Sequence, residues 1–279
     1  MTEFRTLISL LLLSTLVSCA PGAQEEPTPD GSTEAYADSV LSAAFDRWGY
    51  FGTESSVETE TLLPGLVAEM LSEPASMKWE LDSLHKEPYV TTTYSDDGRI
   101  RLLTWLAPGC GTMHRWQSVV CFVDDEGKYH AIGYKAEYDE PDPYSPGAVT
   151  SLHYLRDSHY LALGAGQMSG GMPHESADLV VLTADGLNRS AHCFHTLDGT
   201  FPGLILDKSW YFDHLEEYEE GAPQMLAYDS ATHTLTFPTI LDETGTRLFM
   251  EVFGIGEGIV VEWTRPIRMR WVDTGFVEM

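Results

Sequence analysis

The sequence predicts a mainly β protein: an antiparallel, hairpin-rich domain, arranged as a sandwich or an irregular propeller and preceded by two short helices. From about residue 88 onward, short runs of aromatic and β-branched residues alternate with polar turns. Acidic-Gly turns between such runs, as at Asp97-Gly98 and Glu126-Gly127, are typical of β-hairpins. Successive hairpins at this spacing favour antiparallel all-β structure. No strict repeat supports a regular propeller.

The segment before the strands has apolar residues at helical spacing in two places. In the first, they recur at intervals of three and four from Tyr36 to Trp48, and Gly49 is suited to end the helix. The second helix is predicted to start near Pro64, because proline suits a first helical turn, and to stop at Pro74. Both helices should pack on an edge or a face of the β-sheet.

The predicted strands follow one another along the rest of the chain, and the first eight form pairs across short polar turns. The Gly-rich segment 164–174 is predicted to be a long connection. The strands are Tyr89–Tyr94, Arg99–Leu106, Trp116–Val123, Lys128–Tyr134, Val149–Leu155, His159–Leu163, Leu179–Thr183, Ser190–His195, Leu204–Tyr211, Met225–Tyr228, Thr234–Phe237, Arg247–Phe253, Ile259–Trp263 and Ile267–Val272.

The first residues have the pattern of a targeting signal. The apolar stretch Leu7–Val17 is 11 residues long, whereas a membrane-spanning helix needs about 20. It therefore indicates the hydrophobic region of a signal peptide. The stretch ends in Ser18-Cys19, which resembles the processing site of bacterial lipoproteins. The resemblance implies cleavage after residue 18 and lipidation of Cys19, and two or more acyl chains anchor a protein stably.

The predicted organisation has three parts: a signal peptide at 1–18, the lipidated cysteine with a flexible tether at 19–33, and a single globular domain at 34–279. The domain begins with a helical lead-in at 34–87 and continues as the β-rich part at 88–279. Ala20 stands where many such lipoproteins carry the aspartate that retains them in the inner membrane. We therefore expect the outer membrane, with the body facing the periplasm or the cell surface.

The chain is strongly acidic, with a formal net charge of −27 at pH 7. Such a charge opposes binding to nucleic acid, because that affinity comes largely from Lys and Arg that neutralise phosphates. It also opposes adhesion to anionic lipid. A solvated acidic surface that resists aggregation is the favoured interpretation.

After Cys19, three cysteines remain, of which at most two can pair with each other in an oxidising compartment. Cys110 and Cys121 are the candidate disulfide, because they are close in sequence. Cys121 lies in an apolar run, and the alternative is a small buried hydrophobic residue.

Cys110 and His114 lie four residues apart in the Gly-rich segment 109–114, which suggests a thiolate–imidazole pair for nucleophilic catalysis. Catalytic cysteines lie in electropositive settings, and only Arg115 supplies positive charge nearby. A turn built on the glycines is the favoured alternative.

Two groups of residues are candidates for metal ligands. Cys193 and His195 would share one face of a strand. Two ligands do not make a zinc site, so a strand with one buried Cys–His face is favoured. Met168, Met172 and His174 have the softness that copper prefers, but a flexible hairpin connection explains them equally well.

Acidic clusters at 138–144 and 213–220 could bind calcium or supply a carboxylate pair for glycoside hydrolysis. Neither has the alternating spacing of a calcium loop. Solvated loops are the favoured interpretation.

Six segments cover most of residues 70–263 in a consistent order: Leu71–Ser76, Tyr94–Trp105, Gly111–His114, Tyr160–Gly166, Leu235–Pro238 and Asp242–Gly245. Taken together, they resemble a family of uncharacterised Bacteroidota-type outer-membrane lipoproteins, although the run after the tryptophan is altered here to Leu106–Cys110. The resemblance implies a β-rich secreted domain behind a lipid anchor. Because the family has no established activity, no functional residue is carried over.

The expected function is that of a non-enzymatic, membrane-anchored envelope lipoprotein that binds or scaffolds an envelope protein or a glycan. The expectation depends on the tether, the β-rich body and the lack of a complete catalytic constellation in the sequence. The alternative is an envelope hydrolase acting on glycan or peptide. We predict no cofactor, no contact with nucleic acid, and a membrane connection through the lipid anchor alone.

Overall fold

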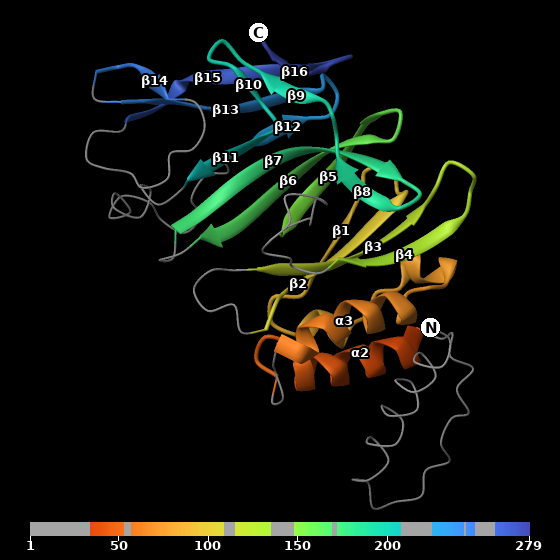
Figure 1. Cartoon of the computed structure of the whole chain (residues 1–279). Coiled ribbons are helices and arrows are strands. Elements are labelled where there is room, and N and C mark those ends of the chain that lie inside the picture. Colours follow the sequence, from red (N-terminus) through yellow and green to blue (C-terminus); the bar gives the residue numbers. More distant parts are fainter. Residues whose placement is uncertain are drawn as a thin grey trace, which may run out of the picture. The chain divides into compact units, whose positions relative to one another are not determined.

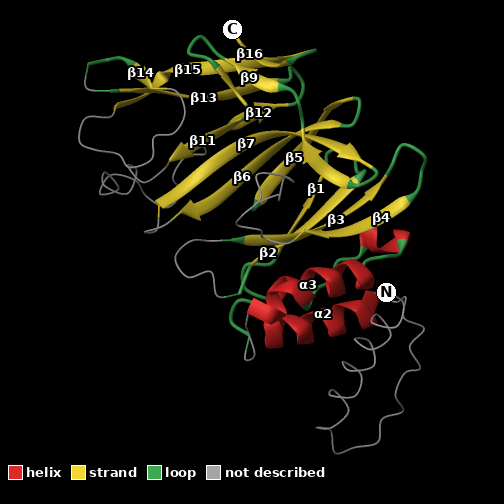
Figure 2. Cartoon of the chain, in the orientation of Figure 1, coloured by secondary structure: helices red, strands yellow, loops and turns green. Residues whose placement is uncertain are grey.

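The computed structural model describes residues 34–52, 57–108, 115–134, 148–168, 172–207, 225–242, 244–248 and 260–279, and residues 32–279 form one compact unit. The fold is mainly β with two α-helices in its N-terminal part, as predicted (Figures 1 and 2). No helix in the described ranges has the length and apolar character needed to cross a membrane.

Helix α2 (Glu34–Trp48) is an amphipathic helix that ends where the sequence predicts. Its buried residues recur at spacings of three and four and include Leu41 and Phe45. The backbone N–H of Gly49 donates to the carbonyl of Phe45 at 2.7 Å and closes the last turn. A Cβ at position 49 would lie 2.6 Å from that same carbonyl oxygen, so glycine is required there.

Helix α3 (Val57–Met70) begins seven residues before Pro64, so the prediction that proline opens this helix is wrong. Tertiary packing explains the difference: Leu63 and Val67 are fully buried, and such burial outweighs the backbone hydrogen bond that an internal proline removes. The helix lies close to β4 (Tyr129–Tyr134). A Cβ on Gly133 of that strand would lie 2.7 Å from the carbonyl oxygen of Pro64.

The first sheet contains four consecutive antiparallel strands in the order β1-β2-β3-β4. Their bounds are β1 (Thr91–Tyr94), β2 (Ile100–Leu106), β3 (Trp116–Val123) and the β4 given above. Both α-helices lie on one side of this sheet (Figure 1), where Trp105 packs edge-to-face on Phe45 with ring centroids 5.4 Å apart. Every residue of β2 is buried, because one face meets the helices and the other meets the second sheet.

The second sheet has the order β11-β7-β6-β5, with β8 paired to β7. β6 extends to Met168 and β7 begins at Met172, so the predicted long connection at 164–174 is mostly strand. The ladder between β6 and β7 continues as far as Met168 opposite Met172. The bounds are β5 (Val149–Arg156), β6 (His159–Met168), β7 (Met172–Thr183), β8 (Gly186–Arg189) and β11 (Gly203–Asp207).

The third sheet has the order β10-β9-β16-β15-β13-β12, with β14 paired to β13. Two predicted strands join into the single strand β15. The ladder between β13 and β15 shifts register between Phe237 and Thr239, close to Pro266 of β15. A bulge accommodates the proline, which cannot donate to the ladder. The bounds are β9 (Cys193–His195), β10 (Thr200–Phe201), β12 (Ala227–Asp229), β13 (Thr234–Leu241), β14 (Arg247–Leu248), β15 (Val260–Val272) and β16 (Gly275–Glu278).

Two hydrophobic clusters lie on opposite faces of the second sheet, which makes it the middle layer. Along β6, Leu161 and Leu163 belong to the cluster shared with the third sheet. Tyr160 and Ala162, which alternate with them, belong to the cluster shared with the first sheet. The order of layers is therefore helices, first sheet, second sheet, third sheet, an arrangement of the sandwich type.

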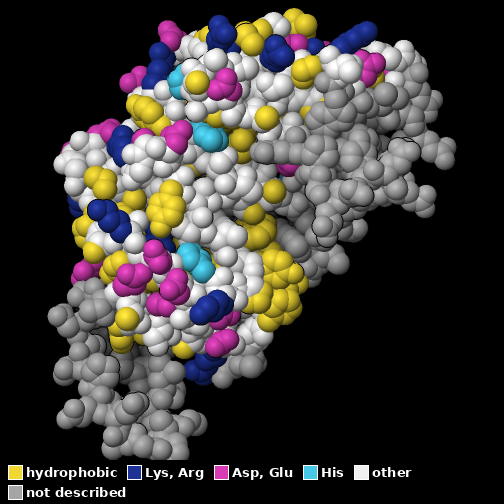
Figure 3. All heavy atoms as spheres, turned by 180° about the vertical axis from the view of Figure 1, so that it is seen from behind, with side chains coloured by type: hydrophobic (Ala, Val, Ile, Leu, Met, Phe, Trp, Pro, Cys, Tyr) yellow, Lys and Arg dark blue, Asp and Glu magenta, His cyan; other side chains and the backbone are white. Residues whose placement is uncertain are grey.

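The surface seen in Figure 3 carries acidic, basic and hydrophobic side chains that are interspersed. The basic side chains on this face do not form one continuous patch. Electrostatic binding of nucleic acid needs a basic stripe or patch, and the described residues on this face form none.

Candidate functional site

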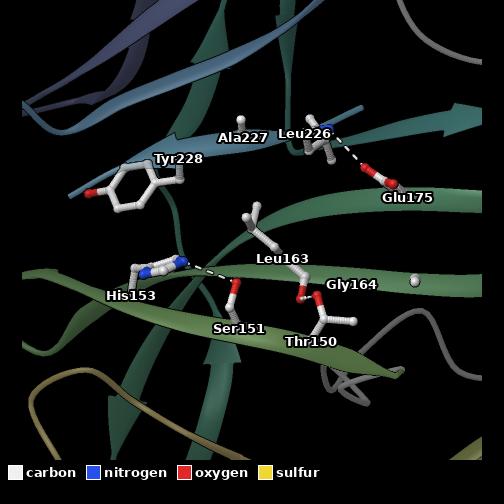
Figure 4. A pocket seen from close by; sticks show the side chains of 10 residues that line it. Thr150, Ser151, His153, Leu163, Gly164, Glu175, Leu226, Ala227 and Tyr228 are labelled. Carbon is white, nitrogen blue, oxygen red and sulfur yellow. Dashed lines mark hydrogen bonds between the residues drawn. The ribbon is translucent and has the colours of Figure 1, made fainter. Parts of the chain in front are cut away.

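A pocket of about 570 Å³ lies between the second sheet and strand β12 (Figure 4). Strands β5, β6 and β7 provide one side, and β12 with the residue before it provides the other (Figure 4). Aromatic, hydroxyl, carboxylate and aliphatic groups all reach the pocket. Its lining residues are Thr150, Ser151, His153, Leu163, Gly164, Ala165, Glu175, Leu226, Ala227 and Tyr228.

The alternation of β5 explains which of its side chains reach the pocket. Ser151 and His153 are two residues apart and therefore share one face of the strand. Leu152 between them points to the opposite face, where it is buried in the cluster shared with the first sheet. The strand thus places a hydroxyl and an imidazole side by side toward the pocket.

Glu175 joins the two sides of the pocket. Its Oε2 accepts hydrogen bonds from the backbone N–H groups of Met225 at 2.9 Å and Leu226 at 2.8 Å. The side chain is only 8% exposed, and a buried carboxylate needs such donors to offset its lost hydration. Glu175 therefore fixes the segment before β12 against β7 and places a negative charge in the pocket wall.

Tyr228 and His153 form adjacent aromatic surfaces from opposite sides of the pocket. Their ring centroids are 4.7 Å apart with the planes tilted by 42°. The Tyr228 hydroxyl is hydrogen-bonded to Nδ1 of His233 at 2.7 Å. Burial, with smaller contributions from Asp96 and Asp229, raises the pKa of Tyr228. The phenol consequently stays neutral at physiological pH.

His153 is held between a hydroxyl and a carboxylate. Its Nε2 lies 3.0 Å from Oγ of Ser151, and its Nδ1 lies 3.5 Å from Oδ2 of Asp96. The other oxygen of Asp96 accepts the backbone N–H of Tyr154 at 2.7 Å, which orients the carboxylate. This is the order nucleophile, base and orienting acid that hydrolytic triads share.

Asp96 reaches β5 because the turn between β1 and β2 is attached to that strand. The backbone N–H of Asp96 donates to the carbonyl of Leu152 at 3.1 Å. The next residue, Asp97, accepts hydrogen bonds from the Tyr160 hydroxyl at 2.9 Å and from the Ser95 hydroxyl at 2.6 Å. These contacts hold a turn of the first sheet against the second sheet and so fix Asp96 beside His153.

The charge of the pocket is negative or neutral. Glu175 lines it, Asp96 lies behind His153, and no lysine or arginine belongs to its described lining. Anionic ligands would meet this charge without a cation to pair with. The pocket therefore suits neutral or cationic molecules.

Several predicted site residues lie outside the described residues. They are Cys19, Cys110, His114 and the acidic clusters at 138–144 and 213–220. Cys121 is described: it is a free cysteine, fully buried in β3, as its alternative interpretation predicts. Burial raises the pKa of its thiol, and Tyr129 and Arg101 partly offset the shift. Because Cys121 is a free thiol in this structure, the candidate Cys110–Cys121 disulfide is not formed in it.

The candidate metal ligands are not gathered into a site by the described residues. No group of three or more His, Cys, Asp or Glu side chains suited to a metal occurs among them. His195 instead contacts the hydroxyl of Thr200 at 3.1 Å and the carbonyl of Thr274 at 3.3 Å. The expectation of a buried Cys–His face on β9 is wrong: Phe194 is fully buried there, because it stacks on Phe276 with centroids 5.6 Å apart.

The Gly-rich candidate group lies at the end of the β6–β7 hairpin. Met168 and Met172 are register partners, and His174 is opposite Gly166. A Cβ on Gly166 would lie 2.5 Å from the His174 ring, which shows that the imidazole lies over this glycine. The copper site stays a prediction, since the side chains of both methionines lie outside the described part.

The residues of the pocket were not singled out from the sequence. The available signal was the Ser-x-His spacing of Ser151 and His153 on a predicted strand, which places both on one face. Asp96, Glu175 and Tyr228 are far from them in sequence. Their convergence depends on how the sheets stack.

No protein-family model matches this chain, and no curated protein or solved structure is significantly similar to it.

Proposed function

We propose that this protein is a membrane-anchored envelope lipoprotein whose β-rich domain binds a neutral glycan in the pocket beside β12. The observation that carries the proposal is the convergence of an aromatic ring, hydroxyl groups and a buried carboxylate in one pocket of about 570 Å³. A volume of this order is typical of small-molecule sites, and the lining combines polar and apolar side chains.

The chemistry of the lining matches that of a sugar. A pyranose presents hydroxyl groups at its edge, and Thr150, Ser151 and Glu175 supply partners for them. It also presents C–H faces, which pack on aromatic rings such as that of Tyr228. Leu163 and Leu226 would cover the apolar part of an N-acetyl or O-acyl substituent.

The charge of the protein supports a neutral ligand over a phosphorylated one. The net charge is −27, and the described lining includes a carboxylate and no lysine or arginine. Attraction to a polyanion would need a positively charged surface with lysine or arginine side chains. The anchor at Cys19 would place the pocket in the envelope, where glycans are exposed to it.

The test is a titration of the purified full-length protein, in detergent, with the disaccharide of N-acetylglucosamine, with cellobiose and with maltose. We expect saturable heat or chemical-shift changes with at least one of them. Tyr228→Ala should weaken the affinity about tenfold, the scale of one lost aromatic contact. Tyr228→Phe keeps the ring and should bind within about threefold of the wild type.

Circular dichroism of both Tyr228 variants controls for folding, because Tyr228 also contacts Phe276. Two results would contradict the proposal: no binding of any of the three sugars, or binding that Tyr228→Ala leaves unchanged.

A further inference from the structure

Ser151, His153 and Asp96 are joined by side-chain contacts to one another, an arrangement that a ligand-binding pocket does not need. The imidazole lies 3.0 Å from the serine oxygen through Nε2 and 3.5 Å from the aspartate through Nδ1. With Asp96 on Nδ1, Nε2 is free to act as the acceptor for the serine proton. Tyr228 packs on the same imidazole at 4.7 Å and restricts its orientation.

We propose that Ser151 is the nucleophile of an acyl-ester hydrolase, with His153 as general base and Asp96 as the residue that positions His153. Both Ser151 and His153 line the pocket, so a bound ester can reach the hydroxyl. Asp96 does not line it and acts through the imidazole. The proposal rests on the proposed function in one respect, which is that the same pocket holds the substrate.

The reaction uses only the chain, the ester and water. Oγ of Ser151 attacks the carbonyl carbon while its proton passes to Nε2 of His153. The bond between the carbonyl carbon and the alcohol oxygen then breaks, and the proton on Nε2 goes to the departing alcohol. Water attacks the acyl-serine and gives one proton to Nε2. The acid is released as the serine oxygen recovers that proton, so the free hydroxyl is restored.

The lining selects the class of ester. Leu163, Ala165 and Leu226 provide an apolar wall suited to a short acyl chain. Glu175 and Thr150 provide partners for hydroxyl groups on the alcohol side. A long anionic acyl group would meet the Glu175 carboxylate. The substrate class is therefore a short-chain acyl ester of a sugar, such as an O-acetyl group.

The first experiment requires no variant. The full-length protein in detergent is incubated with a fluorophosphonate probe, which labels activated serines, and the modified peptide is identified by mass spectrometry. We expect the adduct on Ser151. An absence of labelling, or labelling of other serines with Ser151 unmodified, would overturn the proposal.

The second experiment measures hydrolysis of p-nitrophenyl acetate. Ser151→Ala and His153→Gln should each lower kcat at least 100-fold, the range expected when a nucleophile or base is removed. Ser190→Ala, which removes a hydroxyl outside the pocket lining, should retain the wild-type rate. If Ser151→Ala hydrolyses the ester as fast as the wild type, Ser151 is not the nucleophile.

The role of Asp96 is tested by Asp96→Asn, which retains an oxygen to accept the N–H of Tyr154. A positioning role predicts a kcat at least tenfold lower with KM within about twofold of the wild type. A kcat of Asp96→Asn equal to that of the wild type would contradict the positioning role of Asp96.

The sugar titration separates this proposal from the proposed function. If disaccharides bind but Ser151 is neither labelled nor required for hydrolysis, the domain binds glycans without acyl transfer. If Ser151 is labelled and no sugar binds, the catalytic role of Ser151 stands, but both the glycan-binding proposal and the sugar ester as substrate are wrong.

Discussion

Asp178 shows at the scale of a single residue how packing sets a protonation state. It lies in β7 opposite Gly203 of β11, and a Cβ on that glycine would lie 2.7 Å from Oδ1 of Asp178. Burial raises the pKa of the carboxyl to about 6, although Arg189 lowers it in part. The folded protein therefore binds this proton more tightly than the unfolded chain, whose aspartates titrate near pH 4.

This shift predicts a specific dependence of stability on pH. Between about pH 4 and pH 6 the folded state holds more protons at Asp178, so its contribution to the free energy of unfolding falls as pH rises and is level above that window. Asp178→Asn should remove the dependence. Relative to the wild type, the variant should gain up to about 3 kcal/mol between pH 4 and pH 7. Urea unfolding of the variant and the wild type at pH 4 and at pH 7 measures this difference in the free energy of unfolding.

Asp185→Asn in an exposed turn serves as the matched control and should give the same difference from the wild type at both pH values. An Asp178→Asn difference that does not change with pH would contradict the prediction.

Arg101 is a second buried charge, and its surroundings differ from those of Glu175. Its guanidinium is fully buried, donates to the carbonyl of Ser76 and lies 5.7 Å from the centre of the Tyr94 ring. Its Nε and Nη2 have no hydrogen-bond partner in the described part of the chain. Hydrophobic periodicity in the sequence indicates on which face of a strand a residue such as Arg101 lies. It does not indicate whether a helix will cover that face and bury the residue.

At the scale of elements, strand β16 shows most clearly how tertiary packing places a strand that the sequence did not predict. It was not predicted, yet it occupies the centre of the third sheet, between β9 and β15. It pairs with β9 in parallel, and Phe276 is fully buried against Phe194 and Trp271. Gly275 is required for this arrangement, because a Cβ there would lie 2.0 Å from the carbonyl oxygen of Cys193.

No strand was predicted after Val272, and Gly275 at the start of β16 has a positive φ of 134°. The parallel partner was not visible. β9 lies some 80 residues earlier, and pairing over that separation is decided by burial of the two phenylalanine rings.

Deletion of residues 273–279 should therefore destabilise the protein severely. It removes the strand that joins β9 and β10 to the rest of the sheet and opens the core around Phe194. We expect a loss of more than about 4 kcal/mol, or the loss of a cooperative transition, in urea unfolding monitored by tryptophan fluorescence.

A matched control for the deletion is Val277→Thr, which alters a side chain of β16 that is 36% exposed and keeps the backbone hydrogen bonds of the strand. It should unfold within about 1 kcal/mol of the wild type. Cooperative unfolding of the deleted chain at the wild-type midpoint would show that the third sheet does not need β16.

At the scale of the whole molecule, the proposed anchor and the β-rich domain are separate features. A lipidated Cys19 would hold the domain at a membrane through a tether that ends at residue 33, while the domain begins with α2 at Glu34. Under the lipoprotein proposal, the fractionation of the protein should depend on the side chain of Cys19.

Cys19→Ser should release the protein from the membrane into the soluble envelope fraction, because lipidation requires the thiol. Cell fractionation followed by immunoblotting measures the distribution, and Cys193→Ser is the control that leaves the anchor intact. A Cys19→Ser variant that still sediments with membranes would contradict the lipoprotein assignment.

Local chemistry in the sequence was enough to predict the mainly β class, the end of α2 and most hairpins. Turn residues and side-chain alternation act over a few positions, and each hairpin is specified by residues that are neighbours in the chain. The Ser151–His153 pair belongs to this level, since two residues of separation on a strand place both side chains on one face.

Tertiary structure alone decided which surfaces meet. The stacking of three sheets brings Asp96 from one hairpin, Ser151 and His153 from another, and Glu175 and Tyr228 from two more strands to one pocket. These residues lie up to 132 positions apart along the chain, and burial of both faces of the middle sheet brings them together. The hydrophobic pattern specifies that a face is buried, but the complementary shapes of the packed layers specify its partner.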